Sequence, residues 1–351
     1  MSGAAHEPAA AAPRAAEPAV AAPAPAAGSD WAGRRERSNA LALRLMSWIA
    51  VSCGRRVARW VLHPITLYFM LFAPGPRRQS RRFLRRALGR APRFADGYRQ
   101  VHAFAATVLD RVYLLRGRHA LFDVQVRGEE AVVQTLAEGR GAFLVGAHVG
   151  SFEVLRDVGR HHPGLRIAMV MFPDNARMVN AALRAIAPEV RLDVIALGRP
   201  DTPLRVRDWM DEGGLVGILA DRTLALGDGP RRDLHRLPFL GEPAPFSDGP
   251  FRLAMLLRRR VIFMVGLYLG GARYEVRFQT LADFSTPPAG AAAREAAVRQ
   301  ALHDYVATLE ALCREHPSNW FNFHDVWAQD APAEAAAPGA RPAPGGPDGP
   351  R

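Results

Sequence analysis

The stretch GAFLVGAHVGSFEVLRDVGR, residues 141–160, decides the fold that we expect for this chain. Residues 142–147 form a short, continuous apolar run bounded by glycines, which is typical of a strand buried inside a sheet. The glycines on either side of the next residues allow a sharp turn over 148–151 and leave room for a ligand. A helix is expected to begin near Phe152, with Ser151 as its N-cap. The stretch therefore predicts a strand–turn–helix unit.

The turn carries two side chains with complementary chemistry. His148 and Glu153 are five residues apart, so the carboxylate can hold one imidazole nitrogen while the other takes a proton from an alcohol. The backbone amides near Gly150 and Ser151 are candidates for binding an oxyanion in the substrate. The plainer alternative is a hydrogen-bonded histidine at a strand end and an ordinary first-turn glutamate.

Further short apolar runs alternate with helical patterns along the chain, which predicts an α/β fold with a mostly parallel central sheet flanked by helices. Ligands of such sheets bind beyond the carboxyl ends of the strands, so His148, residues 172–175 and Asp221 are expected on one rim. Arg222 can hold a phosphate or carboxylate bidentately. Asp221 and Arg222 can instead pair with each other. The expected strands are 122–127, 142–147, 165–170, 191–196, 215–220 and 261–269.

The region 31–90 is basic and apolar, and we expect it to be a membrane-associated helical segment. No Asp or Glu lies between Arg37 and Ala95, whereas eleven arginines lie between Arg44 and Arg90. The apolar runs 41–53 and 61–73 are shorter than the roughly 18–20 residues that span a bilayer. They suit helices in the membrane interface, with Trp48, Trp60 and Tyr68 at headgroup depth, or alternatively a pair of buried core helices.

The six arginines of 77–86 are spaced along one face of an expected helix, which favours an anionic membrane surface as partner. We see no nucleic-acid-binding motif beside them, so we expect no nucleic-acid partner. The six arginines are Arg77, Arg78, Arg81, Arg82, Arg85 and Arg86.

The two ends of the 351-residue chain, 1–30 and 331–351, are rich in Ala and Pro and are expected to be disordered. The first has no secretory-signal pattern. Between them, 91–330 is expected to form one α/β domain. The two cysteines have no metal-binding spacing, which favours a reducing compartment and predicts no metal site.

Three blocks in order resemble the bacterial lipid A biosynthesis acyltransferase family, within the HX4D/E glycerolipid acyltransferase superfamily. The first is the HX4E pattern of His148 and Glu153. The second is LPFLGEPAPFSDGPFRLAMLLRRRVIF at 237–263, and the third is NWFNFHDVW at 319–327. The resemblance covers most of the chain between the tails, although Phe172 stands where the family carries Arg.

The resemblance implies an acyltransferase that moves a fatty acyl group from acyl carrier protein or coenzyme A to a hydroxyl or amine of a membrane lipid or glycolipid. His148 would be the general base, Glu153 its charge partner, and Gly150, Ser151, Asp221 and Arg222 substrate-binding residues. No metal or other cofactor is implied. The implied location is the cytoplasmic face of the inner membrane.

Two other functions are compatible with the sequence. One is a non-enzymatic basic membrane- or nucleic-acid-binding protein on an acyltransferase-like fold. The other is a serine hydrolase using Ser151 and His148, which the missing G-x-S-x-G motif disfavours. A second acid/base pair, His324 and Asp325, is a further candidate, although the aromatic residues around it favour packing.

Overall fold

The computed structural model of the chain describes residues 52–160, 165–186, 192–222 and 233–327. These residues belong to one compact unit. The predicted tails 1–30 and 331–351, most of the apolar run 41–53 and Trp48 lie outside the described residues.

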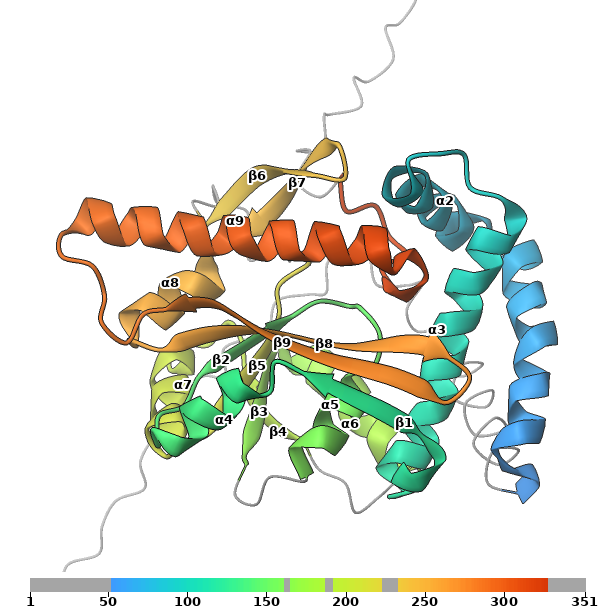
Figure 1. Cartoon of the computed structure of the whole chain (residues 1–351), viewed down its shortest axis with the longest axis horizontal. Helices are drawn as coiled ribbons and strands as arrows, with labels where there is room; N and C mark the ends of the chain where they lie inside the picture. The colour runs from blue at the N-terminus through green and yellow to red at the C-terminus, as the bar shows by residue number, and fades with distance from the viewer. Residues whose placement is uncertain (1–51, 161–164, 187–191, 223–232, 328–351) are drawn as a thin grey trace, which may run out of the picture. The chain divides into compact units, whose positions relative to one another are not determined.

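The centre of the fold is a seven-stranded sheet, mostly parallel as expected (Figure 1). Within this seven-stranded sheet, β8 and β9 are the only antiparallel neighbours among the described residues. The β9 strand and a separate hairpin, β6 (Leu234–Phe239) with β7 (Glu242–Ser247), were not anticipated from the sequence. In spatial order the seven strands are β1 (Asp123–Arg127), β9 (Arg273–Asp283), β8 (Arg260–Gly270), β2 (Phe143–Gly146), β5 (Leu215–Leu219), β3 (Ile167–Met171) and β4 (Asp193–Ala196).

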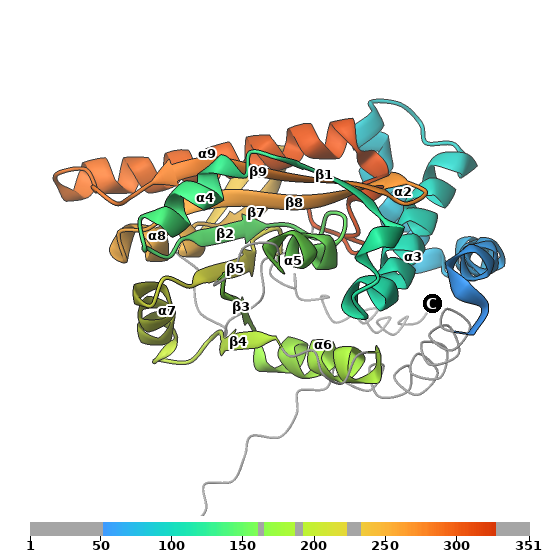
Figure 2. The same ribbon diagram turned by 60° about the horizontal axis from the view of Figure 1, so that its bottom comes forward.

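Helices cover both faces of the sheet, because strands such as β2 are apolar on both sides and must be buried on both. One core contains side chains of α7 (Thr202–Asp211), α8 (Gly249–Leu256) and α9 (Ala291–Glu315). In Figures 1 and 2, α9 runs along β8 and β9. The second core contains side chains of α3 (Phe94–Leu115), α4 (Glu130–Ala137), α5 (Phe152–Arg160) and α6 (Pro173–Ile186).

The strand–turn–helix unit predicted from the sequence is present as β2, the turn 147–151 and α5. The turn packs directly against β8, which continues past the end of β2. Gly150 has φ of 64°, and a Cβ there would lie 1.9 Å from the carbonyl oxygen of Gly266. A Cβ on Gly266 would lie 2.4 Å from the carbonyl oxygen of Ser151. Both positions therefore require glycine, since any side chain would separate the turn from the strand.

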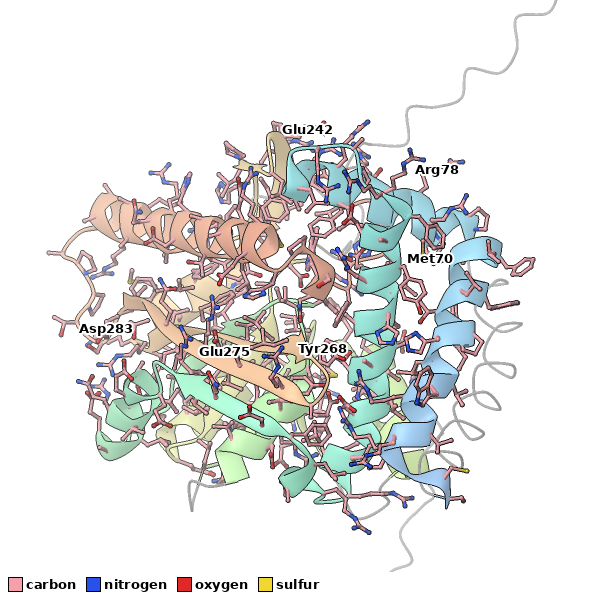
Figure 3. All side chains as sticks on the ribbon, turned by 45° about the vertical axis from the view of Figure 1, so that its right-hand side comes forward. Met70, Arg78, Glu242, Tyr268, Glu275 and Asp283 are labelled. Atoms are coloured by element: carbon pink, nitrogen blue, oxygen red, sulfur yellow. The ribbon has the colours of Figure 1, made fainter. Side chains whose placement is uncertain are left out.

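The first helix of the described chain packs against α3 and the β8–β9 hairpin. The helix Ser52–Phe72 buries Ala58, Leu62, Thr66 and Met70, which recur every fourth residue and form one face. Its arginines Arg55 and Arg59 reach α3 and the β8–β9 hairpin: Arg55 binds Asp110 at 2.8 and 2.9 Å, and Arg59 donates to Tyr268 at 3.0 Å. Figure 3 shows Tyr268 on the side of the hairpin that faces these helices.

No single helix in the described part of the chain is both long and apolar enough to cross a membrane; by length and composition alone, Ser52–Phe72 and α2 (Pro74–Leu88), bent at 93°, pass that test as a pair.

The helix α2 belongs to the same core as the sheet. Its Phe83 and Leu84 are each 1% exposed, and the Phe83 ring lies 4.6 Å from that of Trp320. The helix α2 lies N-terminal to the predicted boundary at residue 90, and it inserts apolar side chains beneath the C-terminal segment.

This packing predicts the effect of truncating α2 side chains. Phe83→Ala should lower the free energy of unfolding by about 3–5 kcal/mol, the usual cost of removing a buried phenylalanine. Arg78→Gln on the exposed side of the same helix should change it by less than about 0.5 kcal/mol. Denaturant unfolding of the two variants measures both values. Equal stability of the two would contradict the placement of α2 in the core.

Candidate active site

His148 and Asp221 meet at the carboxyl ends of two neighbouring parallel strands. His148 follows β2 and Asp221 follows β5, and these strands pair directly in the sheet. The ring Nδ1 of His148 lies 2.8 Å from Oδ1 of Asp221, and the backbone N–H of His148 donates to Oδ2 at 3.0 Å. The sequence placed both residues on one rim but assigned Asp221 to substrate binding. The structure makes it the partner of the histidine.

Trp320 completes the environment of this carboxylate. Its indole N–H donates to Oδ2 of Asp221 at 3.0 Å. Burial by itself would raise the pKa of Asp221, but the charge of His148 and the hydrogen bonds from His148 and Trp320 outweigh it and lower the pKa to about 2. Asp221 is therefore ionised at neutral pH although it is only 3% exposed.

An ionised carboxylate only accepts hydrogen bonds, which fixes the tautomer of the histidine. Nδ1 of His148 carries the proton that faces Asp221, so in the neutral form of the ring the lone pair is on Nε2. The His148 side chain is 30% exposed, whereas that of Asp221 is fully buried. The pair is thus a base oriented by a buried acid, with the basic atom on the ring's other side.

Glu153 does not hold His148, contrary to the sequence prediction. It forms an ion pair with Arg111 of α3, whose Nε lies 2.6 Å from Oε1, and Oγ of Ser151 lies 3.4 Å from Oε2. The physical reason is that Glu153 already belongs to α5, which packs against α3. Glu153 therefore links α5 to α3 through its ion pair with Arg111.

The backbone amides of Gly150 and Ser151, expected to bind substrate, are already used within the protein. The Gly150 N–H donates to the carbonyl of Asn319 at 2.9 Å, and the Ser151 N–H donates to that of Gly266 at 2.7 Å. The turn is bridged on one side by β8 and on the other by the C-terminal segment. Ser151 itself is 2% exposed, which also removes it as an accessible nucleophile.

Three polar side chains near the pair have buried atoms without a hydrogen-bond partner among the described residues: Nε of Arg222, Nε2 of His324, and both amide atoms of Asn322. Each orphaned buried group typically costs about 1–3 kcal/mol. Burial lowers the pKa of Arg222, which Asp221 partly opposes. Burial and the charge of Arg222 lower the pKa of His324 to about 4, so this ring is neutral at pH 7. Asp325, the other member of the expected second acid/base pair, binds Arg82 through its carboxylate, and no hydrogen bond joins it to His324 among the described residues.

Sequence reasoning missed Trp320, Arg111 and Asn322 as members of the site. The cluster of aromatic residues at 319–327 indicated packing beside the site, and the rings of Phe83 and Phe239 do contact Trp320. A tryptophan N–H needs a buried acceptor when its ring is enclosed, so Trp320 was a signal from which a nearby acceptor could have been inferred.

Within the described ranges, no group of three or more His, Cys, Asp or Glu side chains is placed to hold a metal ion. No protein-family model matches the chain, and no curated protein matches it. The function of the chain is therefore inferred from the geometry of this site.

The depressed pKa of His324 predicts an acid-sensitive stability. The His324 ring takes up a proton near pH 4 in the folded protein, whereas a histidine in the unfolded chain does so near pH 6.5. The contribution of His324 to the free energy of unfolding is therefore constant above pH 6.5 and falls as the pH drops from 6.5 to 4. His324→Gln cannot take up a proton, so it should flatten the fall. Denaturant unfolding at pH 7.5, 6 and 4.5 measures the difference, and parallel curves for the two proteins would show that His324 is not the group responsible.

Proposed function

We propose that the protein is an acyltransferase that moves a fatty acyl group from a thioester, on acyl carrier protein or coenzyme A, to a hydroxyl or amine of a membrane lipid or glycolipid. The observation that carries the proposal is the hydrogen bond from His148 Nδ1–H to the buried, ionised carboxylate of Asp221. This arrangement leaves Nε2 as the basic nitrogen of a ring that is 30% exposed, at the carboxyl ends of parallel strands, where ligands of such folds bind.

In the proposed reaction the acceptor oxygen or nitrogen attacks the thioester carbonyl carbon while Nε2 of His148 takes its proton. Asp221 orients the ring and stabilises the imidazolium that forms, as the acid does in a Ser–His–Asp triad. The tetrahedral intermediate then expels the thiolate, which recovers the proton from His148. The proposed reaction needs no nucleophile from the protein, and the hydroxyl of the buried Ser151 is directed to Glu153.

Removing the proposed base, His148, should greatly slow the reaction. His148→Ala should lower the rate of thioester-dependent acyl transfer by about 10²–10⁴-fold, the usual contribution of general-base catalysis, and leave the protein folded. The assay follows thiol release from myristoyl-coenzyme A and from myristoyl-acyl carrier protein, with a membrane lipid extract as acceptor. A folded His148→Ala protein with the wild-type rate would refute the proposed function.

The two carboxylates should have separable roles. Asp221→Asn removes the charge that stabilises the imidazolium and should approach the loss caused by His148→Ala; the double variant should be no slower than His148→Ala alone. Glu153→Gln should cost less rate and lower the melting temperature, because it leaves Arg111 without its partner. Rate and melting temperature of each variant are compared. A larger loss of rate for Glu153→Gln would return that residue to the role the sequence suggested.

An exposed apolar face, rich in aromatic residues, supports the membrane part of the proposal. The helix Ser52–Phe72 packs one face against the protein and leaves large apolar side chains on the other, which is unusual for a face that meets only water. Trp60 is 76% exposed and Phe72 68%. The other exposed apolar side chains of this helix are Val57, Leu67, Tyr68, Phe69 and Leu71.

The arginines of α2 divide into two groups. Arg82 and Arg86 bind inward, where they form ion pairs with Asp325 and Glu242 and lie 5.4 and 4.4 Å from the ring of Trp327. The other four, which we call the outer arginines, are exposed, and Figure 3 shows one of them, Arg78, on the outer side of α2. The outer arginines are Arg77, Arg78, Arg81 and Arg85. We therefore propose that four arginines, rather than the six expected, face the membrane.

Replacing the four outer arginines by Gln should weaken binding to vesicles containing anionic lipid, by about 1 kcal/mol for each basic residue near the surface. Replacing Arg82 and Arg86 by Gln should leave vesicle binding nearly unchanged and lower the melting temperature instead. Co-sedimentation with phosphatidylglycerol vesicles at low salt measures binding. Equal binding by the two variants would show that the outer arginines do not face the membrane.

A further inference from the structure

Two asparagines three residues apart in the C-terminal segment are equally buried but differently bonded. Asn319 and Asn322 are each 1% exposed. The amide of Asn319 is fully used: it accepts from the Tyr268 N–H at 2.8 Å and donates to the Tyr268 carbonyl at 3.0 Å. Neither amide atom of Asn322 has a partner in the described part of the chain. The fold satisfies one amide and leaves the other for something else, since buried polar groups in native proteins are rarely orphaned.

The segment carrying Asn322 runs beside the catalytic turn. The N–H of Phe321 donates to the carbonyl of His148 at 2.8 Å, so Asn322 is the next residue after that contact. Two residues further, His324 is close enough to Asp221, Arg222 and His148 for their charges to influence its ring. Arg222 is adjacent to Asp221 in the chain. The orphaned groups of Arg222 and His324 therefore lie beside the His148–Asp221 pair, and Asn322 stands between Phe321, which binds the turn, and His324.

Acyl transfer needs hydrogen-bond donors for the negative charge that develops on the carbonyl oxygen. The turn amides of Gly150 and Ser151 are spent on Asn319 and Gly266. Asp221 accepts three hydrogen bonds, from His148 and Trp320, so these donors are also spent. The orphaned donors beside the pair are those of Asn322 and Arg222, together with the neutral ring of His324.

We propose that Asn322 and Arg222 form the oxyanion site of the reaction; the inference rests on the proposed acyl transfer. As the acceptor oxygen bonds to the thioester carbon, the carbonyl π electrons move to its oxygen, and the Asn322 amide N–H and the Arg222 guanidinium donate to it. His148 holds the acceptor's proton at this stage. When the intermediate collapses, the C=O bond re-forms, the C–S bond breaks, and the leaving thiolate takes that proton.

The ligand that fits this site is the acyl donor's carbonyl oxygen rather than an acceptor phosphate. The site offers a single cation, Arg222, next to the anionic Asp221, and a histidine kept neutral by burial, so it has little net charge for a dianion. An amide N–H and one guanidinium suit an oxygen that carries charge only in the transition state.

The test uses water in place of the unidentified acceptor. Purified full-length protein in detergent micelles is given myristoyl-coenzyme A or myristoyl-acyl carrier protein, and thiol release is followed at several donor concentrations. Asn322→Leu, of similar volume, should lower kcat about 10²–10³-fold with KM for the thioester little changed. Its melting temperature should stay level or rise, by about 2–4 °C, because two orphaned groups are removed. Arg222→Gln should show the same kcat loss.

Asn319→Leu is the matched control, since it removes an equally buried amide that is bonded; it should melt at a lower temperature than wild type. The oxyanion role is overturned if Asn322→Leu keeps the wild-type kcat, if it raises KM alone, or if its melting temperature falls as far as that of Asn319→Leu. Should Asn322→Leu not fold, Asn322→Asp, which keeps the shape but loses the N–H, decides by the same kcat criterion. Wild-type thiol release no faster than that of His148→Ala would instead overturn the proposed function itself.

Discussion

The buried carboxylate of Asp221 is the constraint on which the site depends. An ionised acid in a protein interior is costly unless several donors surround it. Here the donors come from the turn after β2, through the ring and backbone of His148, and from the C-terminal segment, through Trp320. The need to bind this carboxylate brings three segments, far apart in sequence, together at the carboxyl ends of β2 and β5.

The same carboxylate explains what the sequence could and could not predict. The strand before His148 was recognisable because a buried parallel strand reads as a continuous apolar run, and parallel topology then placed Asp221 on the same rim. The identity of the histidine's partner was not predictable, because proximity along the chain favoured Glu153. Helix packing decides otherwise: Glu153 faces Arg111, and Asp221 reaches His148 through strand pairing across 73 residues.

Other differences arise from long-range pairing. The β9 strand is 11 residues long but partly exposed, and its pattern has no strict alternation, so local sequence did not mark it as a strand. It forms because β8 supplies an antiparallel partner along almost its whole length. The turn amides show the same limit. Glycines at 146 and 150 indicated a tight turn correctly, but only the neighbouring strand and the C-terminal segment determine that its N–H groups are occupied.

The arginines of the basic N-terminal region fall into two groups, which the charge pattern of the sequence did not distinguish. Arg82 and Arg86 lie against Trp327 and bind acidic residues of the protein, whereas the outer arginines lie on the surface. Between the two groups, Phe83 contacts Trp320. The helix that carries the exposed charge is therefore in contact with the residue that donates to Asp221.

The hydrogen bond between Trp320 and Asp221 joins residues 99 positions apart, and this separation has a consequence for biosynthesis. A ribosome adds Asp221 and His148 well before Trp320, so the strands can pair while the carboxylate still lacks its indole donor. During that interval the growing chain contains the base and its acid without the segment that encloses them. The carboxylate therefore gains its indole donor only late in translation, after α9 and the segment that carries Trp320 have been made.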